Sequence, residues 1–532
     1  MGKITKARQA PGTRAPEVSV ALPAMLGALC AMLGAIAPAR AQPTPSTPAA
    51  SMTAANVTAD AAFAAADRLF ETYCLDAHVP GLVYGIVADG RLVHVKAFGV
   101  QDLETRRPVT ADSLFRIASM TKAFTALTVL KLRDDGRLRL DALAEEYVPE
   151  MRGWRYPTDD ARRIRVRDLL NHIAGFVTDN PWGDRQTSLP EDEFTQLLRS
   201  GVPLTRAPGS AYEYSNLGFA LLGRIITNVS REPYAETITR TLLRPLGMQS
   251  SGFVADAAPR ERRALGYRWE DDAWRLEPTL APGAFGAMGG VQTSASDYAK
   301  WVTFLLSAWP PRDAAESGPV RRATVRELAE GSNFLRARVR PGRGGADACR
   351  EATAYGMGMQ VAADCELGLT LSHSGGYPGY GSHVLLLIDH GVGIFAFANR
   401  TYGAPVAPTW EAAVVLLKAG LLPARSMPVG ADLAAAYRAA AAIYAAGAVT
   451  ANPDALAMNF LLDRDAAHWA SYLAELKAQV GDCDAAAPLS ATGALSGDFT
   501  WRCAHGRLQG SLILAPTRPP GIQELDLAVI PP

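Results

Sequence analysis

The chain has 532 residues, which is too long for one typical domain and suits two or three. Hydrophobic residues make up 48% and charged residues 20%, so most of the chain is expected to be globular rather than disordered. The formal net charge is zero, and the chain without its basic N-terminal end is slightly acidic. This charge balance gives no electrostatic case for binding nucleic acid or an anionic membrane surface.

The N-terminal end has the pattern of an export signal. A basic segment precedes an apolar run from Val18 to Ala37, and Ala39-Arg40-Ala41 supplies the small residues that signal peptidase requires. We therefore expect a signal peptide over residues 1–41 and a periplasmic or secreted protein. The alternative is an uncleaved anchor, which a proline within the run disfavours; no later membrane segment is expected. Residues 42–58 are rich in Pro, Ser, Thr and Ala and predict a linker.

The next part of the chain predicts strands at both ends of a domain and helices between them. A helix is expected at 59–73, and the sequence around Asp89-Gly90 predicts a hairpin with strands at 82–87 and 92–95. Apolar spacing predicts a helix at 118–132, followed by mostly helical patterns. Strands and a closing helix return late, at 359–363, 367–371, 383–388, 392–398 and 408–419. This order indicates one sheet built from both ends of the domain.

A second linker is expected at 423–429, so the first domain should cover residues 59–422. Beyond it, helices are expected at 433–446 and 466–480, and short strands at 499–502, 508–514 and 524–529. We interpret residues 430–532 as a small α+β accessory domain. It contains no catalytic or ligand-binding motif, and its predicted role is to bind a protein partner.

The cysteines suit an oxidising compartment. Cysteines that are close in sequence readily pair in such a compartment. We therefore expect the disulfides Cys349–Cys365 and Cys483–Cys503, and Cys74 is expected to stay unpaired. The sequence has no C-x-x-C pair and no H-E-x-x-H cluster. We therefore expect neither a metal nor a cofactor.

Ser119 and Lys122 form the first motif of chemical interest, within Phe115–Lys122. Three residues apart on a helix, they project from one face within reach of each other. A serine hydroxyl needs a base to take its proton, and lysine serves only if its pKa is lowered, by burial or by the positive end of a helix dipole. Backbone N–H groups at the helix start can also stabilise an oxyanion. Alone, however, a Ser-x-x-Lys spacing arises by chance too often to identify a site.

Tyr214-Ser215-Asn216 is the second motif, where a turn-rich loop enters an apolar helix. The Tyr214 phenol could hold or relay a proton, and the Asn216 amide could orient a substrate amide. Alternatively, Tyr214 packs in the interior and Asn216 caps the helix.

The third motif, Leu371–Gly376, lies at the end of a predicted strand. Glycines at such a place let the backbone approach a substrate closely. Gly376 could supply an oxyanion N–H, and Ser374 could bind a carboxylate or carbonyl. A phosphate-binding loop is disfavoured because no Gly-Lys-Ser/Thr sequence follows; a plain hairpin turn is the other alternative.

In this order and at these separations, the three motifs resemble those of the β-lactamase-related serine hydrolases, which are S-x-x-K, Y-x-N and K/H-x-G. That family includes class C β-lactamases, secreted DD-carboxypeptidases, D-aminopeptidases and related esterases. Four further segments agree with it: 169–176, 244–248, 289–294 and 355–358. The resemblance covers roughly residues 58–422. It implies an antiparallel five-stranded sheet flanked by helices, with an all-helical subdomain and the site between them.

The resemblance also implies a role for each motif. Ser119 would be acylated, and Lys122 and Tyr214 would share the role of general base. The backbone N–H groups of Ser119 and Gly376 would form the oxyanion hole. Substrate-binding positions would be Asn216, which would hold the substrate amide, and His373, Ser374 and Gly375.

His373-Ser374-Gly375 departs from the lysine form of the third motif that is typical of class C β-lactamases. A histidine is mostly neutral at pH 7 and anchors a substrate carboxylate less firmly than lysine does. We therefore expect an acyl-enzyme hydrolase of D-amino-acid (cell-wall type) peptides or related amides. The alternatives are a carboxylesterase, a weak β-lactamase, or a penicillin-binding or regulatory protein with little turnover. The other histidines, among them His172 and His383, are expected to be structural, and loops around Trp182 and Arg343 to wall the pocket.

Overall fold

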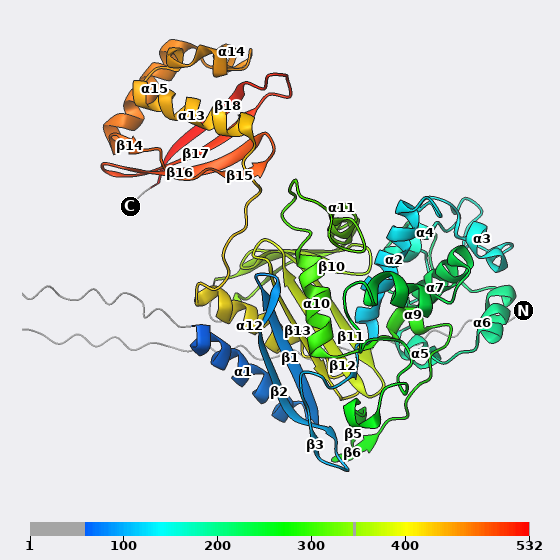
Figure 1. Cartoon of the computed structure of the whole chain (residues 1–532). Coiled ribbons are helices and arrows are strands. Elements are labelled where there is room, and N and C mark those ends of the chain that lie inside the picture. The colour runs from blue at the N-terminus through cyan, green and yellow to red at the C-terminus, as the bar shows by residue number, and fades with distance from the viewer. Residues whose placement is uncertain (1–58, 344–346, 531–532) are drawn as a thin grey trace, which may run out of the picture. The chain divides into compact units, whose positions relative to one another are not determined.

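The structure is a computed structural model that describes residues 59–343 and 347–530 (Figure 1). The expected signal peptide and first linker lie outside these residues. Within them, both expected disulfides are present, Cys349–Cys365 and Cys483–Cys503, and Cys74 is a free thiol.

The first two strands form the predicted tight hairpin. β1 (Gly81–Ala88) and β2 (Arg91–Asp102) are joined by Asp89 and Gly90, whose φ angles of 50° and 72° suit a two-residue hairpin turn. β1 then pairs antiparallel with the late strand β13 (Val392–Ala398). Strands from both ends of the domain therefore share one sheet, as predicted, and Figure 1 shows blue β1 beside yellow-green β13.

The sheet is larger than the five strands implied by the resemblance. In the described part of the chain it has nine strands in the order β3-β2-β1-β13-β12-β11-β10-β9-β8, and each neighbouring pair is antiparallel. The strands not yet given are β3 (Arg107–Pro108), β8 (Asn333–Arg340), β9 (Cys349–Tyr355), β10 (Gln360–Asp364), β11 (Gly368–Tyr377) and β12 (Tyr380–Leu387). The antiparallel fold class is confirmed, whereas the strand number is corrected. The extension at β8 and β9 was not predicted.

Helices cover both faces of the sheet. Tyr84 and Phe70 belong to the core on the face under α1 (Ala59–Asp76) and α12 (Val406–Lys418). Val83 belongs to the core on the opposite face, together with Phe124 of α2 (Lys122–Asp134) and Trp301 of α10 (Ala295–Leu306). Since neighbouring residues of β1 face opposite cores, the strand is buried on both sides.

Most of the remaining helices of this part form the expected helical region beside the sheet (Figure 1). They are α3 (Ala144–Tyr147), α4 (Val166–Leu170), α5 (Asn180–Gly183), α6 (Glu191–Ser200), α7 (Asn216–Ser230), α8 (Tyr234–Ile238) and α9 (Gly286–Gly289). The short helix α11 (Arg322–Arg326) lies apart from them, near β10 in Figure 1. Two small sheets pair β4 (Phe115–Arg116) with β7 (Gln292–Thr293), and β5 (Tyr267–Glu270) with β6 (Ala273–Leu276).

The C-terminal part has α+β composition and its own core, which includes Trp469 and Trp501. Its elements are α13 (Ala431–Ala446), α14 (Phe460–Asp463), α15 (Ala466–Val480), β14 (Cys483–Asp484), β15 (Ser490–Gly493), β16 (Ser496–Cys503), β17 (Gly506–Leu514) and β18 (Ile522–Ile530). The disulfide Cys483–Cys503 joins β14 to β16, where the two cysteines are direct register partners. It ties the two strands together.

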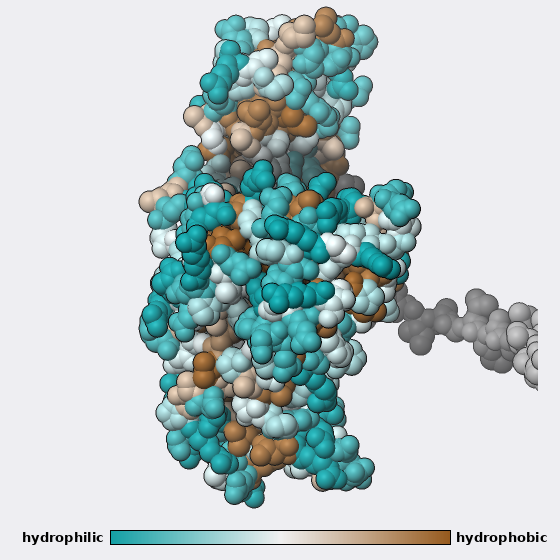
Figure 2. Space-filling model, turned by 90° about the vertical axis from the view of Figure 1, so that its right-hand side faces the viewer, coloured by the Kyte–Doolittle hydropathy of each residue, from teal (hydrophilic) through white to brown (hydrophobic). Residues whose placement is uncertain are grey.

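The face drawn in Figure 2 is mostly hydrophilic, and its hydrophobic residues gather in small, separate patches. Among the described residues, no helix combines the length and the hydropathy needed to cross a lipid bilayer.

Candidate active site

Ser119 sits at a sharp turn between β4 and α2. Ala118 has a φ of 47°, an uncommon backbone conformation for a residue with a side chain, and a short 3₁₀ turn, Ala118–Thr121, follows. α2 begins only at Lys122. The prediction placed both residues on one continuous α-helix. Instead, Ser119 lies in the 3₁₀ turn and Lys122 begins α2, but the two side chains still face each other. Ser119 is 7% exposed.

Lys122 is fully buried and points its amine at three oxygen atoms. Its Nζ lies 3.1 Å from Ser119 Oγ, 2.8 Å from Asn216 Oδ1 and 2.9 Å from the carbonyl oxygen of Met288. Burial lowers the pKa of Lys122 well below its ordinary value of 10.5, although nearby carboxylates act in the opposite direction. A neutral amine has two N–H groups for the Asn216 and Met288 oxygens. Its lone pair is then left for the Ser119 hydroxyl, which is the arrangement that a general base needs.

Tyr214 completes a triangle with these residues. Its phenol is hydrogen-bonded to the Ser119 hydroxyl, and Lys122 Nζ lies 4.9 Å from the centre of its ring. Desolvation raises the pKa of Tyr214 well above 10. The phenol therefore keeps its proton at neutral pH, so that in the resting site it is suited to give a proton rather than to take one.

Asn216 lies behind Lys122 instead of facing the cavity. It is fully buried; its Oδ1 accepts from Lys122, and its Nδ2 donates to Asn180 Oδ1 and Asp184 Oδ1, each at 3.2 Å. In this structure, all of these hydrogen bonds of the Asn216 amide are to residues of the protein, and its expected contact with a substrate amide stays a prediction. The alternative of a helix cap is not realised, because the Ser215 side chain caps α7.

Two aspartates that the sequence did not single out support this arrangement. Asp179 accepts from the backbone N–H groups of Asn216 at 2.6 Å and Leu217 at 2.9 Å, which holds the start of α7. Asp184 is buried beside Asn216, and desolvation raises the pKa of its carboxyl. Both carboxylates favour the charged form of Lys122 and so oppose the effect of burial. Asp179 directly precedes the short helix α5, and Asp184 begins the 3₁₀ turn that follows it; these elements are too short to show a periodic sequence pattern.

The third motif lies within β11, which continues to Tyr377 and is longer than predicted. His373 Nε2 lies 3.1 Å from the Tyr355 hydroxyl, and His373 Nδ1 lies 2.7 Å from the Ser374 carbonyl oxygen. Burial lowers the pKa of His373 to about 3, so the ring is neutral at pH 7. Nδ1–H then donates to the carbonyl, and the Tyr355 hydroxyl donates to Nε2.

Gly375 explains why β11 can lie against the turn that carries Ser119. A Cβ atom at this position would stand 2.2 Å from Ser382 Oγ and 2.3 Å from the carbonyl oxygen of Ile117. Only glycine fits there. The close approach brings Gly376 to the cavity over Ser119, whereas the exposed Ser374 side chain turns to His383, with Oγ 2.9 Å from Nδ1.

A cavity of about 380 Å³ opens over Ser119. It is lined by Ser119, Asn180, Asp184, Tyr212, Tyr214, Gln360, His373, Ser374, Gly376 and Tyr402. Among these described residues the ionisable acid is Asp184, and no lysine or arginine is present. The neutral His373 adds no positive charge, so the cavity offers no cation to a substrate carboxylate.

His172 and His383 lie next to the site, and the contacts of His172 are structural, as expected. His172 Nδ1 accepts from the backbone N–H of Ser215 at 3.1 Å, and its ring packs beside Tyr214 at 4.4 Å between centroids. This contact supports the turn that carries Tyr214. The segment around Trp182, expected to be a loop that walls the pocket, forms α5 and a 3₁₀ turn and contributes Asn180 and Asp184 to the cavity wall.

The fold and the paired serine and lysine are those of a serine hydrolase. Residues 59–418 match the beta-lactamase family, and the chain belongs to that family. The resemblance seen in the sequence is thus confirmed.

Relatives of known name agree with this assignment. Protein flp from Staphylococcus aureus (strain COL) is 30% identical over 251 residues, which are 46% of this chain and 49% of that protein. Esterase EstB from Burkholderia gladioli is 33% identical over 233 residues, 41% of this chain and 58% of that protein. The chain thus spans about half the length of the curated relatives it matches.

Solved structures share the fold. The octameric penicillin-binding protein homologue from Pyrococcus abyssi has a TM-score of 0.55 at 21% identity, covering 88% of this chain and 98% of its own. D-alanine carboxypeptidase AmpC from Burkholderia cenocepacia has a TM-score of 0.53 at 20% identity, covering 68% and 99%.

Proposed function

We propose that this chain is an exported hydrolase that forms an acyl-enzyme on Ser119. The observation that carries the proposal is the buried Lys122 amine, whose two neighbouring oxygen acceptors leave its lone pair for the Ser119 hydroxyl. In the first step, Ser119 Oγ attacks the substrate carbonyl while its proton moves to Lys122 Nζ. The backbone N–H groups of Ser119 and Gly376 are our candidates for the oxyanion hole.

We assign Tyr214 the role of proton donor to the leaving group. Its protonated phenol gives a proton to the departing oxygen or nitrogen and regains one from the Lys122 ammonium. Water then attacks the acyl-enzyme and loses a proton to Lys122 Nζ. The bond between the acyl group and Ser119 breaks, Lys122 returns the proton to Ser119 Oγ, and the carboxylic acid is released. Asn216 and Met288 act by positioning the amine.

The favoured substrates are esters or amides without a charged group beside the scissile bond. The neutral His373 and the lack of a lysine or arginine among the described residues of the cavity support this choice. The similarity to an esterase supports it as well. The carboxylesterase alternative therefore comes before the D-amino-acid peptides of cell-wall type, whose terminal carboxylate would find no cation in this cavity.

One experiment separates the alternatives. The chain without residues 1–41 is incubated with a short-chain nitrophenyl ester and with a fluorescent penicillin, beside Ser119→Ala. Ser200→Ala serves as a control because its hydroxyl is exposed at the end of α6. Rapid ester turnover without an adduct supports the esterase, and a stable penicillin adduct supports the peptidase. Equal activity in Ser119→Ala would refute the mechanism.

Export is supported by the N-terminal signal pattern and by the two disulfides, which an oxidising compartment permits. Cell fractionation of the tagged full-length chain tests it. Recruitment of a protein partner by the C-terminal part stays a prediction.

A further inference from the structure

A second cavity, of about 330 Å³, adjoins the one over Ser119, and Gln360 and Ser374 line both. We call it the arginine pocket. Its walls are Arg336, Arg338, Arg340, Arg343, Glu351, Thr353, Gln360, Ala362, Ser372, Ser374, His383, Val406 and Trp410. Gln360 and Ser374 therefore form the boundary between the cavity over Ser119 and the arginine pocket.

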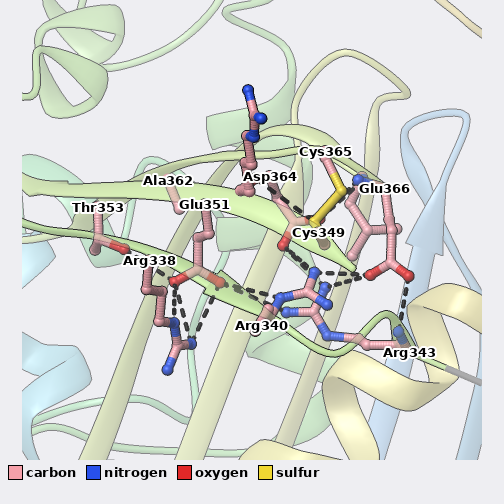
Figure 3. Close-up of polar contacts among 12 residues, drawn as sticks. Arg338, Arg340, Arg343, Cys349, Glu351, Thr353, Ala362, Asp364, Cys365 and Glu366 are labelled. Atoms are coloured by element: carbon pink, nitrogen blue, oxygen red, sulfur yellow. Dashed lines mark hydrogen bonds and ion pairs between the residues drawn. A yellow bond between two sulfur atoms is a disulfide. The ribbon is translucent and has the colours of Figure 1, made fainter. Parts of the chain in front are cut away.

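The strand pattern explains why arginines gather here. Arg336, Arg338 and Arg340 alternate along β8 and so project from one face of the sheet. Glu351 and Thr353 of the paired strand β9 share that face. Figure 3 shows Arg338 and Arg340 of β8 directed toward Glu351 of β9.

The two inner arginines are fully engaged within the protein. Arg340 Nη2 lies 2.7 Å from Asp364 Oδ2 and 2.7 Å from Glu366 Oε2, and Arg343 Nη1 lies 2.9 Å from the same Asp364 oxygen (Figure 3). Cys349 lies near both carboxylates, but its sulfur is in a disulfide and offers no ligand to a metal. These contacts hold the turn between β10 and β11 to β8.

The two outer arginines share one carboxylate with Arg340. Arg338 donates to both oxygens of Glu351, at 3.2 and 3.3 Å, whereas Arg336 lies 3.9 Å from Glu351 Oε1. The side chains of Arg336 and Arg338 are 56% and 46% exposed. Across the cluster, four guanidinium groups meet the three carboxylates of Glu351, Asp364 and Glu366, so one positive charge is in excess.

A second observation comes from His383 on the wall of the same pocket. Its Nδ1 is occupied by Ser374 Oγ, whereas its buried Nε2 has no hydrogen-bond partner among the described residues. Buried polar atoms normally have partners, so an unpaired one on a pocket wall indicates a place for a ligand's polar atom.

We propose that the arginine pocket binds a carboxylate carried by the substrate, several bonds from the carbonyl that Ser119 attacks. The inference rests on the proposed function and narrows its substrate class to esters or amides with a remote acidic group. Arginine suits this task because its planar guanidinium pairs with both oxygens of a carboxylate. Trp410, with Arg343 4.4 Å from its ring centre, supplies an apolar wall for the connecting chain.

The kinetic test compares two esters of equal length, p-nitrophenyl pentanoate and mono-p-nitrophenyl glutarate. We expect Arg336→Ala/Arg338→Ala to lower kcat/KM for the glutarate ester about tenfold and to leave the pentanoate within about twofold. Arg350→Ala is the matched control, because Arg350 is an exposed arginine on β9 outside the pocket. Added salt should reduce the glutarate preference of the unmodified chain alone.

A binding measurement makes the inference independent of turnover. Calorimetry with glutarate on the Ser119→Ala chain should detect binding that the double arginine variant loses and Arg350→Ala keeps. Absence of binding, or equal loss in both arginine variants, overturns the arginine pocket. Pentanoate turnover that depends on Ser119, without any glutarate preference, overturns this inference while sparing the proposed function. Failure to hydrolyse either ester, together with no penicillin adduct on Ser119, refutes the proposed function, and the calorimetry still decides the pocket.

Discussion

Replacing Lys122 with methionine tests the role of the buried amine. The methionine keeps the length of the side chain but removes the lone pair that faces Ser119 Oγ at 3.1 Å. A general base contributes roughly 10² to 10⁴ in rate, so kcat for ester hydrolysis at pH 7 should fall at least about 100-fold. The matched control is Lys131→Met, a surface lysine of the same helix paired with Asp135.

The same variant changes how stability depends on pH. Since folding lowers the pKa of Lys122, the unfolded state binds more protons than the folded state between that lowered value and 10.5. The free energy of unfolding of the unmodified chain therefore rises with pH across this window, by up to about 1.4 kcal/mol per pH unit, and falls as the pH is lowered. Lys122→Met lacks this contribution, so denaturant melts should show a shallower rise for it.

Two results would refute this reasoning. If Lys122→Met retains its acylation rate in stopped-flow measurements, Lys122 is not the base. If the difference in unfolding free energy between the two chains stays constant between neutral pH and pH 10, the amine is not held neutral by the fold. Lys131→Met, whose side chain is on the surface, should match the unmodified chain in both assays.

Three further substitutions probe separate parts of the site. Tyr214→Phe should lower kcat about 100-fold with an amide, and much less with a nitrophenyl ester, whose good leaving group needs no proton; equal losses would contradict the assigned role. Gly375→Ala should cut ester turnover and lower the melting temperature, because its Cβ would stand 2.3 Å from the carbonyl oxygen of Ile117; an unchanged melting temperature would show that the strand can shift. Asp179→Ala should cost about 1–3 kcal/mol of stability by leaving two backbone N–H groups of α7 without acceptors, and a denaturant midpoint equal to that of the unmodified chain would exclude this.

The sequence predicted most of the framework because its signals are local. The Asp89-Gly90 turn, the strand at 392–398 and the helix that starts after Ser215 depend on neighbouring residues, and they appear where expected. The strand β8 was missed, since its arginines do not resemble a buried strand. Its pairing with β9 is a tertiary contact that local pattern does not determine.

The site shows the same limit at the level of single residues. Ser119, Lys122 and Tyr214 come together as their motifs predict, but Asn216 turns its amide to Lys122 instead of to the cavity. The direction of that amide depends on Asp184, which lies in a 3₁₀ turn 32 residues before it in the sequence. A motif thus predicts which residues meet, whereas neighbours from other segments decide which way each side chain points.

Positive charge is kept apart from the base in this site. A cation beside Lys122 would disfavour the charged amine and lower its pKa further, but His373 is neutral because burial, and then repulsion from Lys122, lowers the pKa of His373. Because the His373 ring is neutral, the pKa of Lys122 depends on burial, which lowers it, and on Asp184 and Asp179, which raise it. The exposed guanidinium groups of Arg336 and Arg338 stand in the adjoining cavity instead, where water and salt screen their effect on the amine. In the proposed scheme, selection for an acidic substrate is therefore separated from the chemistry that activates Ser119.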